Sequence, residues 1–398
     1  MPAYPRHEIV ADDRVGLYHC NVRCVRRAFL CGDDPVSGKN HDHRKEWIRL
    51  RLQGLAAVFG IDVCGYAVMS NHFHVVLRVR PDLAQGWSDA EVALRWRLLY
   101  PPRDEVTGLQ TKPEQVDLNI ITSDPARVDE LRHRLASLSW FMRCLNEHIA
   151  RAANREDHCS GRFWQGRFRS VALLDEAAAL ACSVYVDLNP IRAGVAGTPE
   201  ESEFTSAFDR IRSLPASSSD STRAGKSSLD EPALKSSIER ISPAESARPD
   251  AWLCELTLNE SASELPDAAR LPEQVAAPVV AANDGEAEVA AGPCRSRPTL
   301  AARASDRGYL PIELEKYLSL LDWTGRELRA GSRGTIPTRL SPILDGLGLN
   351  SECWLETVLH FGRWFKRAAG GRDSLAAAAL RCGRRWFQGQ RAATIAFQ

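Results

Sequence analysis

The sequence predicts an α+β domain built on a small antiparallel sheet, followed by an acidic linker and a small all-α domain. Three observations lead to this prediction. Residues 1–212 alternate between segments of strand period and segments of helical period, residues 213–304 are rich in Ser, Ala, Pro and acids, and residues 305–398 show only helical period. A chain of 398 residues also exceeds the usual size of one hydrophobic core, which favours two domains joined by a linker.

Each element follows from the spacing of its apolar residues. The predicted strands are residues 17–25 and 65–79, and the predicted helices are residues 44–59, 131–152, 175–188, 312–323 and 353–365. The linker has too few apolar residues to fold alone. Its one exception is residues 252–256, which form either an isolated turn or a short element docked on a folded domain.

Charge is unevenly distributed although the net charge is zero. Residues 1–200 hold 26 basic and 25 acidic side chains, residues 201–300 hold 10 and 17, and residues 301–398 hold 15 and 9. The overall charge therefore gives no argument for a nucleic-acid partner. No apolar run approaches the roughly 18 residues that cross a bilayer, and the first residues lack the pattern of a secretion signal. We expect a cytoplasmic protein with no membrane partner.

The eleven cysteines are odd in number and include no Cys-x-x-Cys pair, which indicates buried thiols in a reducing compartment. The nearest approach to a zinc site is Cys20, Cys24 and Cys31 with His41 and His43. That spacing matches no common set of zinc ligands, so the sequence predicts no structural zinc there.

Chemistry first appears in residues 65–79, where His72 and His74 are separated by one residue. Side chains alternate between the faces of a strand, so the two imidazoles share one face while Phe73 points to the other. Such a pair suits a metal ion, although two unrelated surface histidines are an equal alternative. A histidine triad would need a third His at Val76, and a two-histidine phosphoesterase would need Ser or Thr at His74.

A second candidate lies at the end of the helix predicted at residues 175–188. Tyr185 and Asn189 are four residues apart and are neighbours on a face other than the buried stripe of Leu180, Val184 and Leu188. Because Asn189 precedes a proline, it lies at the helix end, where its amide oxygen can turn towards an ion. The alternative is a half-buried tyrosine with a capping asparagine.

A third candidate is the segment of residues 158–169, which holds three arginines, three aromatics and no acidic residue. Arginines pair with phosphates and aromatic rings stack on unpaired bases, so this mixture suits a single strand or a hairpin. A basic surface loop with incidental aromatics is the alternative.

Together, the three segments resemble a known family. Met-x-Asn-His-x-His at residues 69–74, Trp-Gln-Gly-Arg-Phe at 164–168 and Tyr-x-x-x-Asn-Pro-x-Arg-Ala-Gly at 185–194 occur in the order of the single-tyrosine HUH transposases, especially the REP-associated tyrosine transposases. The resemblance covers about the first 200 residues. Ser70 stands where many relatives have proline, and residues 80–139 form a longer insertion than relatives usually carry.

The resemblance implies a ferredoxin-like domain that cleaves and rejoins single-stranded or hairpin DNA. It implies that His72, His74 and Asn189 hold a divalent metal, Mg²⁺ or Mn²⁺, and that Tyr185 is the nucleophile of a 5′-phosphotyrosine intermediate. Imidazole favours softer ions, so Mn²⁺ should serve at least as well as Mg²⁺. The residues expected to bind DNA are Arg162, Trp164, Gln165, Arg167, Arg169 and Arg192.

Two further functions stay open beside an active transposase. One is a domesticated nuclease that processes repeated extragenic hairpins, and the other is a DNA-binding protein that has lost its chemistry. Relatives include monomers and homodimers, so the resemblance leaves the oligomeric state open. Because every candidate catalytic residue precedes the linker, residues 1–212 are expected to act as an autonomous nuclease.

Overall fold

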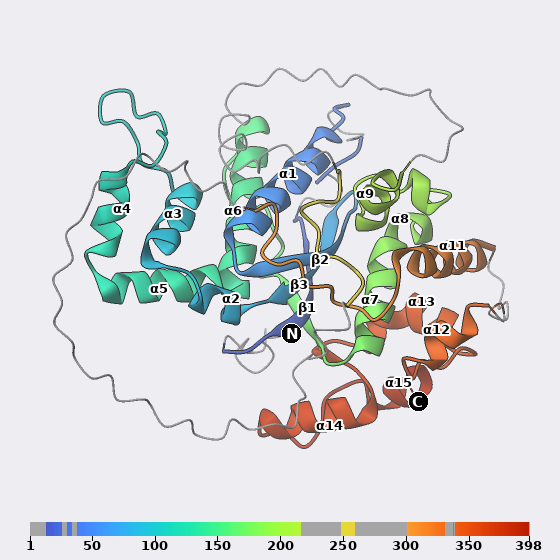
Figure 1. Ribbon diagram of the computed structural model, residues 1–398. Helices are drawn as coiled ribbons and strands as arrows, with labels where there is room; N and C mark the ends of the chain where they lie inside the picture. Colours follow the sequence, from blue (N-terminus) through green and yellow to red (C-terminus); the bar gives the residue numbers. More distant parts are fainter. Residues whose placement is uncertain are drawn as a thin grey trace, which may run out of the picture.

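The computed structural model describes residues 13–25, 30–33, 38–215, 248–258, 301–330, 337 and 339–397. It is built on a sheet with the strand order β2-β3-β1-β4-β5 (Figure 1). The strands are β1 (Gly16–Arg23), β2 (Ile61–Val68), β3 (His72–Val79), β4 (Arg169–Leu173) and β5 (Ala368–Ala369). Strands β1 to β4 pair antiparallel, whereas the short β5 pairs parallel to β4. The sheet is thus mixed and not purely antiparallel, because a segment near the C-terminus adds to its edge.

Helices pack around this sheet in the α+β arrangement that the sequence predicts. They are α1 (His43–Val58), α2 (Pro81–Gln85), α3 (Asp89–Leu99), α4 (Gln115–Thr122), α5 (Pro125–Leu135), α6 (Leu138–Glu156), α7 (Glu176–Asp187), α8 (Asn189–Arg192), η2 (Pro199–Glu201), α9 (Ser206–Arg212), α11 (Leu314–Ala330), α12 (Ser341–Asp345), α13 (Trp354–Trp364), α14 (Arg372–Arg381) and α15 (Gln390–Ala396). Strand β4 carries no alternating pattern long enough to predict it.

Two predicted elements are each divided by a turn. The strand predicted at residues 65–79 is the hairpin of β2 and β3, closed where the Met69 amide donates to the His72 carbonyl. The helix predicted at 131–152 is the end of α5 and most of α6, with Ser137 before the second helix. Apolar periodicity continues across both turns because both flanking segments face the same core, so periodicity alone could not locate the break.

The insertion at residues 80–139 contains helices α2 to α5, which gather on one side of the sheet (Figure 1). The insertion is anchored by Arg95 of α3, whose Nη1 donates to the carbonyls of Ala57 and Val58 at 2.9 and 3.1 Å. These two residues end α1, so Arg95 caps that helix and neutralises its C-terminal partial charge. The insertion is therefore a packed part of the domain.

Residues 252–256 dock on the domain, which decides between the two alternatives left by the sequence. The Trp252 ring is buried and lies 5.2 Å from the Tyr66 ring, and the Cys254 amide donates to the Val63 carbonyl at 2.8 Å. Most of the predicted linker lies outside the described residues. This part of it covers one edge of the sheet.

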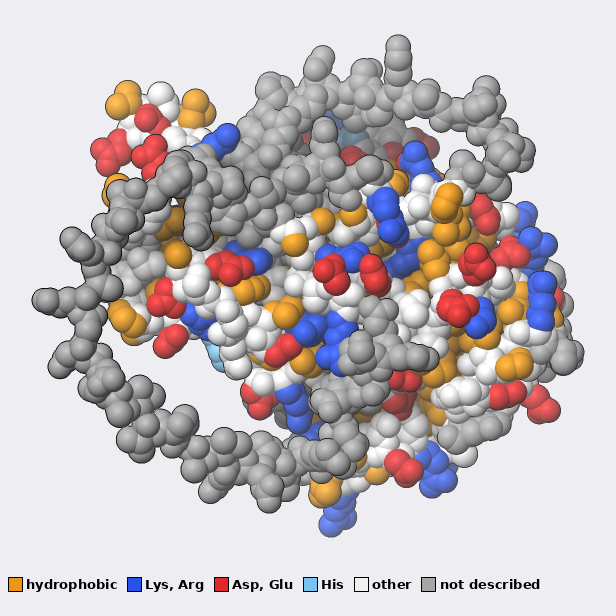
Figure 2. Space-filling view, viewed as in Figure 1, with side chains coloured by type: hydrophobic (Ala, Val, Ile, Leu, Met, Phe, Trp, Pro, Cys, Tyr) orange, Lys and Arg blue, Asp and Glu red, His pale blue; other side chains and the backbone are white. Residues whose placement is uncertain are grey.

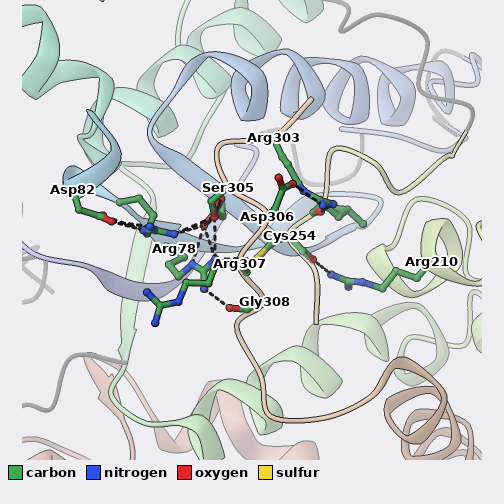
Figure 3. Close-up of polar contacts among 12 residues, drawn as sticks. Arg78, Asp82, Arg210, Cys254, Arg303, Ser305, Asp306, Arg307 and Gly308 are labelled. Atoms are coloured by element: carbon green, nitrogen blue, oxygen red, sulfur yellow. Dashed lines mark hydrogen bonds and ion pairs between the residues drawn. The ribbon is translucent and has the colours of Figure 1, made fainter. Parts of the chain in front are cut away.

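A polar clasp holds residues 303–308 beside the same edge (Figure 3). Buried Arg78 of β3 forms an ion pair with Asp62 at 2.7 Å and donates to the Gly308 carbonyl at 2.6 Å. Ser305 Oγ donates to Asp62 at 2.9 Å. Because both charges are buried, each requires its partner, and the clasp ties this segment to the sheet.

The C-terminal helices pack directly on the first part of the chain (Figure 1). The Tyr317 hydroxyl donates to Asp187 at the end of α7, and the Leu174 amide after β4 donates to the Ala369 carbonyl at 2.9 Å. Buried residues of both parts belong to one apolar cluster. The borders at residues 212 and 304, and the autonomy of residues 1–212, stay predictions.

On the face shown in Figure 2, basic and acidic side chains are interspersed among the described residues, as expected for a chain without net charge. In the described part of the chain, no helix combines the length and the apolar character needed to cross a membrane.

Candidate active site

The two histidines of β3 lie side by side on one face of the sheet. The ring centroids of His72 and His74 are 5.0 Å apart, and both side chains face α7. Phe73 points to the other face, where its ring contacts Trp164 at 5.7 Å. Trp164 in turn donates to the Asn146 carbonyl of α6 at 2.8 Å, so α6 covers the face opposite the histidines.

A third histidine, which the sequence did not single out, completes the cluster. His19 of β1 is buried, and its Nε2 lies 2.8 Å from His74 Nδ1, with the two rings stacked at 5.0 Å. Position 19 is diagonal to position 74 across the β1–β3 pair. The signal available in the sequence was Tyr-His-Cys within an apolar strand, where a single histidine carries no spacing rule.

Tyr185 of α7 lies over this cluster. Its ring is perpendicular to those of His74 and His19, at centroid distances of 5.7 and 5.9 Å. The helix is buried along its length, and its first turn is capped by Asp175, which accepts from the Ala178 amide. The structure therefore brings together the tyrosine and the histidine pair that the sequence separates by more than 100 positions.

Asn189 and Arg192 both contact the Tyr185 region. The Asn189 amide nitrogen donates to the carbonyls of Tyr185 and Val186 at 2.9 and 3.3 Å, so it caps the end of α7 and only its oxygen remains for an ion. The Arg192 guanidinium lies 4.8 Å from the centre of the Tyr185 ring. Sequence reasoning assigned Arg192 to DNA alone, whereas the structure also places it beside the candidate nucleophile.

Burial keeps the imidazoles neutral. It lowers the pKa of His19 to about 4, and burial together with the charge of Arg23 lowers the pKa of His72 to about 4. The pKa of His74 falls well below its usual value for the same reason, with further contributions from its neighbouring histidines. Burial raises the pKa of Tyr185, and Arg192 offsets part of that rise. Neutral imidazoles have the free electron pair that a metal requires.

Helix α13, which lies far outside the family resemblance, covers the tyrosine. The ring of Phe361 is 5.6 Å from that of Tyr185, and a Cβ atom added to Gly362 would lie 2.6 Å from the tyrosine hydroxyl. Arg192 Nη2 donates to the Leu359 carbonyl of α13 at 2.7 Å. Glycine at position 362 therefore allows the close approach of α13 to the hydroxyl.

The loop before β4 only partly fits the sequence expectation. Arg162, Gln165, Arg167 and Arg169 are exposed, as DNA contacts require. Trp164 is 9 % exposed and packs against Phe73 and Phe163, which corrects the expectation that its ring stacks on a base. Aromatic residues that alternate with arginines look alike in the sequence whether they bind bases or fill the core.

Basic residues from other segments lie close to this loop. Arg23 acts electrostatically on His72, and Arg169 and Arg363 both act on Lys366, whose pKa they and burial lower. Arg363 and Lys366 belong to α13 and the residues after it, which sequence reasoning left without a role. Their positive charges extend the basic rim of the site beyond the loop.

Comparison with known proteins gives one distant structural match. No protein-family model and no curated protein matches the sequence. A solved structure of a REP-associated tyrosine transposase bound to a REP hairpin is similar over 58 % of this chain and 100 % of that chain, with 14 % identity and a TM-score of 0.32. At this TM-score the match gives no support to a function, so the geometry of the site alone carries the proposal below.

Proposed function

We propose that this protein cleaves and rejoins single-stranded or hairpin DNA through a covalent bond between Tyr185 and a 5′-phosphate, as a transposase of the single-tyrosine HUH type. The observation that carries the proposal is the convergence of Tyr185 with His72, His74 and His19 on one face of the sheet. The strand order β4-β1-β3-β2, with α1 and α6 as crossovers, agrees with the ferredoxin-like domain that the resemblance implies.

The residues present fit a divalent metal. Asn71 Oδ1 lies 2.7 Å from His72 Nδ1, so it can accept that proton and leave Nε2 free for an ion. His19 can do the same for His74 Nδ1. The amide oxygen of Asn189 is a further ligand candidate. A bound Mn²⁺ or Mg²⁺ would place positive charge at the attacked phosphate.

The chain's own residues account for the remaining steps. The Tyr185 oxygen forms a bond to phosphorus while the bond from phosphorus to the 3′ oxygen breaks, and the phenolic proton is lost as the 3′ oxygen becomes a hydroxyl. Arg192 lies beside the ring and favours negative charge on the tyrosine oxygen. Joining reverses the step when a 3′-hydroxyl attacks the phosphotyrosine, so no nucleotide cofactor is needed.

The exposed arginines Arg162, Arg167 and Arg169 are proposed to hold the phosphate backbone, with Arg363 and Lys366 beside them. Gln165 is exposed on the same loop and can contact a base or phosphate. Trp164 supports the loop from within the core.

A covalent adduct tests the proposal. The protein is incubated with labelled hairpin DNA and Mn²⁺, denatured, and examined for a complex whose attached peptide is then mapped. We expect the adduct on Tyr185, its loss in Tyr185→Phe with DNA binding retained, and its persistence in the control Tyr100→Phe. Cleavage without an adduct would mean that water is the nucleophile, and an adduct on another tyrosine would move the site.

One observation favours a second candidate, a DNA-binding protein without chemistry. The close approach of Gly362 and Phe361 to Tyr185 narrows the space at the hydroxyl. DNA binding with neither cleavage nor adduct, in Mn²⁺ and in Mg²⁺, would select this candidate.

A further inference from the structure

A second group of metal-ligating side chains lies where the N-terminus of α1 meets the C-terminus of α6. His41 precedes α1 and His43 begins it, while Glu156 ends α6 and Asp157 follows it. The two helices pack on each other (Figure 1). They cover the face of the sheet opposite His74, because α6 contacts Trp164, which packs on Phe73. This cluster is therefore separate from the candidate active site.

The donor atoms converge. One ligand atom from each of His41, Glu156 and Asp157 lies within 4.8 Å of the others. His43 Nε2 lies 2.7 Å from Glu156 Oε1, and His41 Nδ1 lies 4.0 Å from the same oxygen. His41 is 5 % exposed, and its Nδ1 is buried without a hydrogen-bond partner. A buried nitrogen without a partner costs free energy unless something binds it.

The charges also suit a cation. Arg44 is 1 % exposed and binds one oxygen of each carboxylate, with Nε donating to Glu156 Oε2 at 2.6 Å and Nη2 donating to Asp157 Oδ1. One guanidinium against two carboxylates leaves one negative charge when the imidazoles are neutral. Burial and the nearby Arg44 lower the pKa of His41, which favours its neutral form. Glu156 Oε1, the oxygen that faces both imidazoles, is not the one that Arg44 holds.

We propose that His41, His43, Glu156 and Asp157 form a second divalent-metal site, of the zinc class, with two imidazole nitrogens and two carboxylate oxygens as ligands. Nitrogen and oxygen ligands at about 2.1 Å in a tetrahedral arrangement lie about 3.4 Å apart, which the donors reach by small side-chain rotations. The cysteines that the sequence grouped with these histidines are replaced in this cluster by acids from the other end of the domain.

The site has a structural consequence for the DNA-binding loop. Residues 158–169 begin directly after Asp157, and the loop is held at its base where Asn154 Nδ2 donates to the Gly161 carbonyl at 3.0 Å. A metal that joins Asp157 and Glu156 to the start of α1 fixes the point from which the loop leaves α6. The ion orders the exposed arginines without taking part in cleavage.

The test counts metal ions bound by the full chain. The starting protein is His72→Ala/His74→Ala, which removes the proposed catalytic centre, in buffer with a non-chelating reductant. Titration with Co²⁺, followed by visible absorption and calorimetry, should show one bound equivalent without the absorption of a thiolate–cobalt bond. Adding His41→Ala or Glu156→Gln should abolish that equivalent, whereas the exposed control His133→Ala on α5 should keep it.

Several outcomes would overturn the proposal. If no Co²⁺ binds, the cluster is an ion-pair clasp between His43 and Glu156, and if His41→Ala binds it unchanged, the ion lies elsewhere. The near-isosteric Glu156→Gln variant, checked for folding by thermal melting, separates lost ligation from lost structure. The proposal does not depend on the catalytic one: if the double variant binds as many ions as the wild type, the catalytic metal assignment fails and this site survives.

Discussion

Replacing His19 by leucine tests whether this histidine positions His74. His19 Nε2 is the hydrogen-bond partner of His74 Nδ1 at 2.8 Å, and both side chains are buried. Leucine fills the space but leaves His74 Nδ1 without a partner, which costs about 1–3 kcal/mol of stability. Loss of the group that orients a metal-binding histidine weakens metal affinity by about 10–100-fold. We therefore expect both a lower free energy of unfolding and weaker Mn²⁺ binding.

The assay combines urea unfolding with calorimetric titration of Mn²⁺. His19→Gln retains a side-chain oxygen that can accept from His74 and should restore part of the metal affinity. The matched control is His148→Leu, which removes a buried histidine of α6 whose Nε2 has no partner and should leave Mn²⁺ binding unchanged. Wild-type Mn²⁺ affinity in His19→Leu would refute the positioning role, whatever the change in stability.

Three other predictions concern the loop, the histidine pair and α13. Replacing all three exposed loop arginines by alanine should weaken hairpin binding and reduce its salt dependence by about one unit for each phosphate that is no longer bound, measured by anisotropy against Arg143→Ala; the same curve at every salt concentration would contradict this. Because His72 and His74 have lowered pKa values and bind protons only at low pH, Mn²⁺ affinity should stay nearly constant between pH 7 and pH 5.5, and a decline beginning near the ordinary pKa of about 6.5 would show that the imidazoles are not desolvated. Gly362→Ala should lower the melting temperature, with about 1–3 kcal/mol of overpacking against Tyr185, and a variant as stable as the wild type would place α13 elsewhere in solution.

Local sequence patterns predicted the elements whose spacing is set by a single core face. The helix of residues 175–188 is α7 to within one residue at each end, and that of residues 44–59 is α1 to the same accuracy. Alternation on β3 likewise placed His72 and His74 on one face. These features depend only on the period of the backbone, which the order of residues specifies directly.

Contacts between distant segments could not be predicted in this way. His19 joins the site because β1 pairs with β3, and Trp164 leaves the DNA surface because Phe73 offers it a core partner. The closeness of His41 to Glu156 likewise depends on α1 packing against α6. In each case the decisive neighbour is more than 50 positions away, and no local period encodes which segments will meet.

The sequence by itself determined the candidate nucleophile, the histidine pair and the mixed helix and strand content, since each is a short pattern with its own physical meaning. Only the tertiary structure decided what surrounds them: a third imidazole beside His74, α13 against Tyr185, and C-terminal cations near the loop. The physical reason is that burial and packing bring together side chains from segments that are unrelated in sequence, and the environment of a group, more than its identity, sets its protonation and its access to solvent.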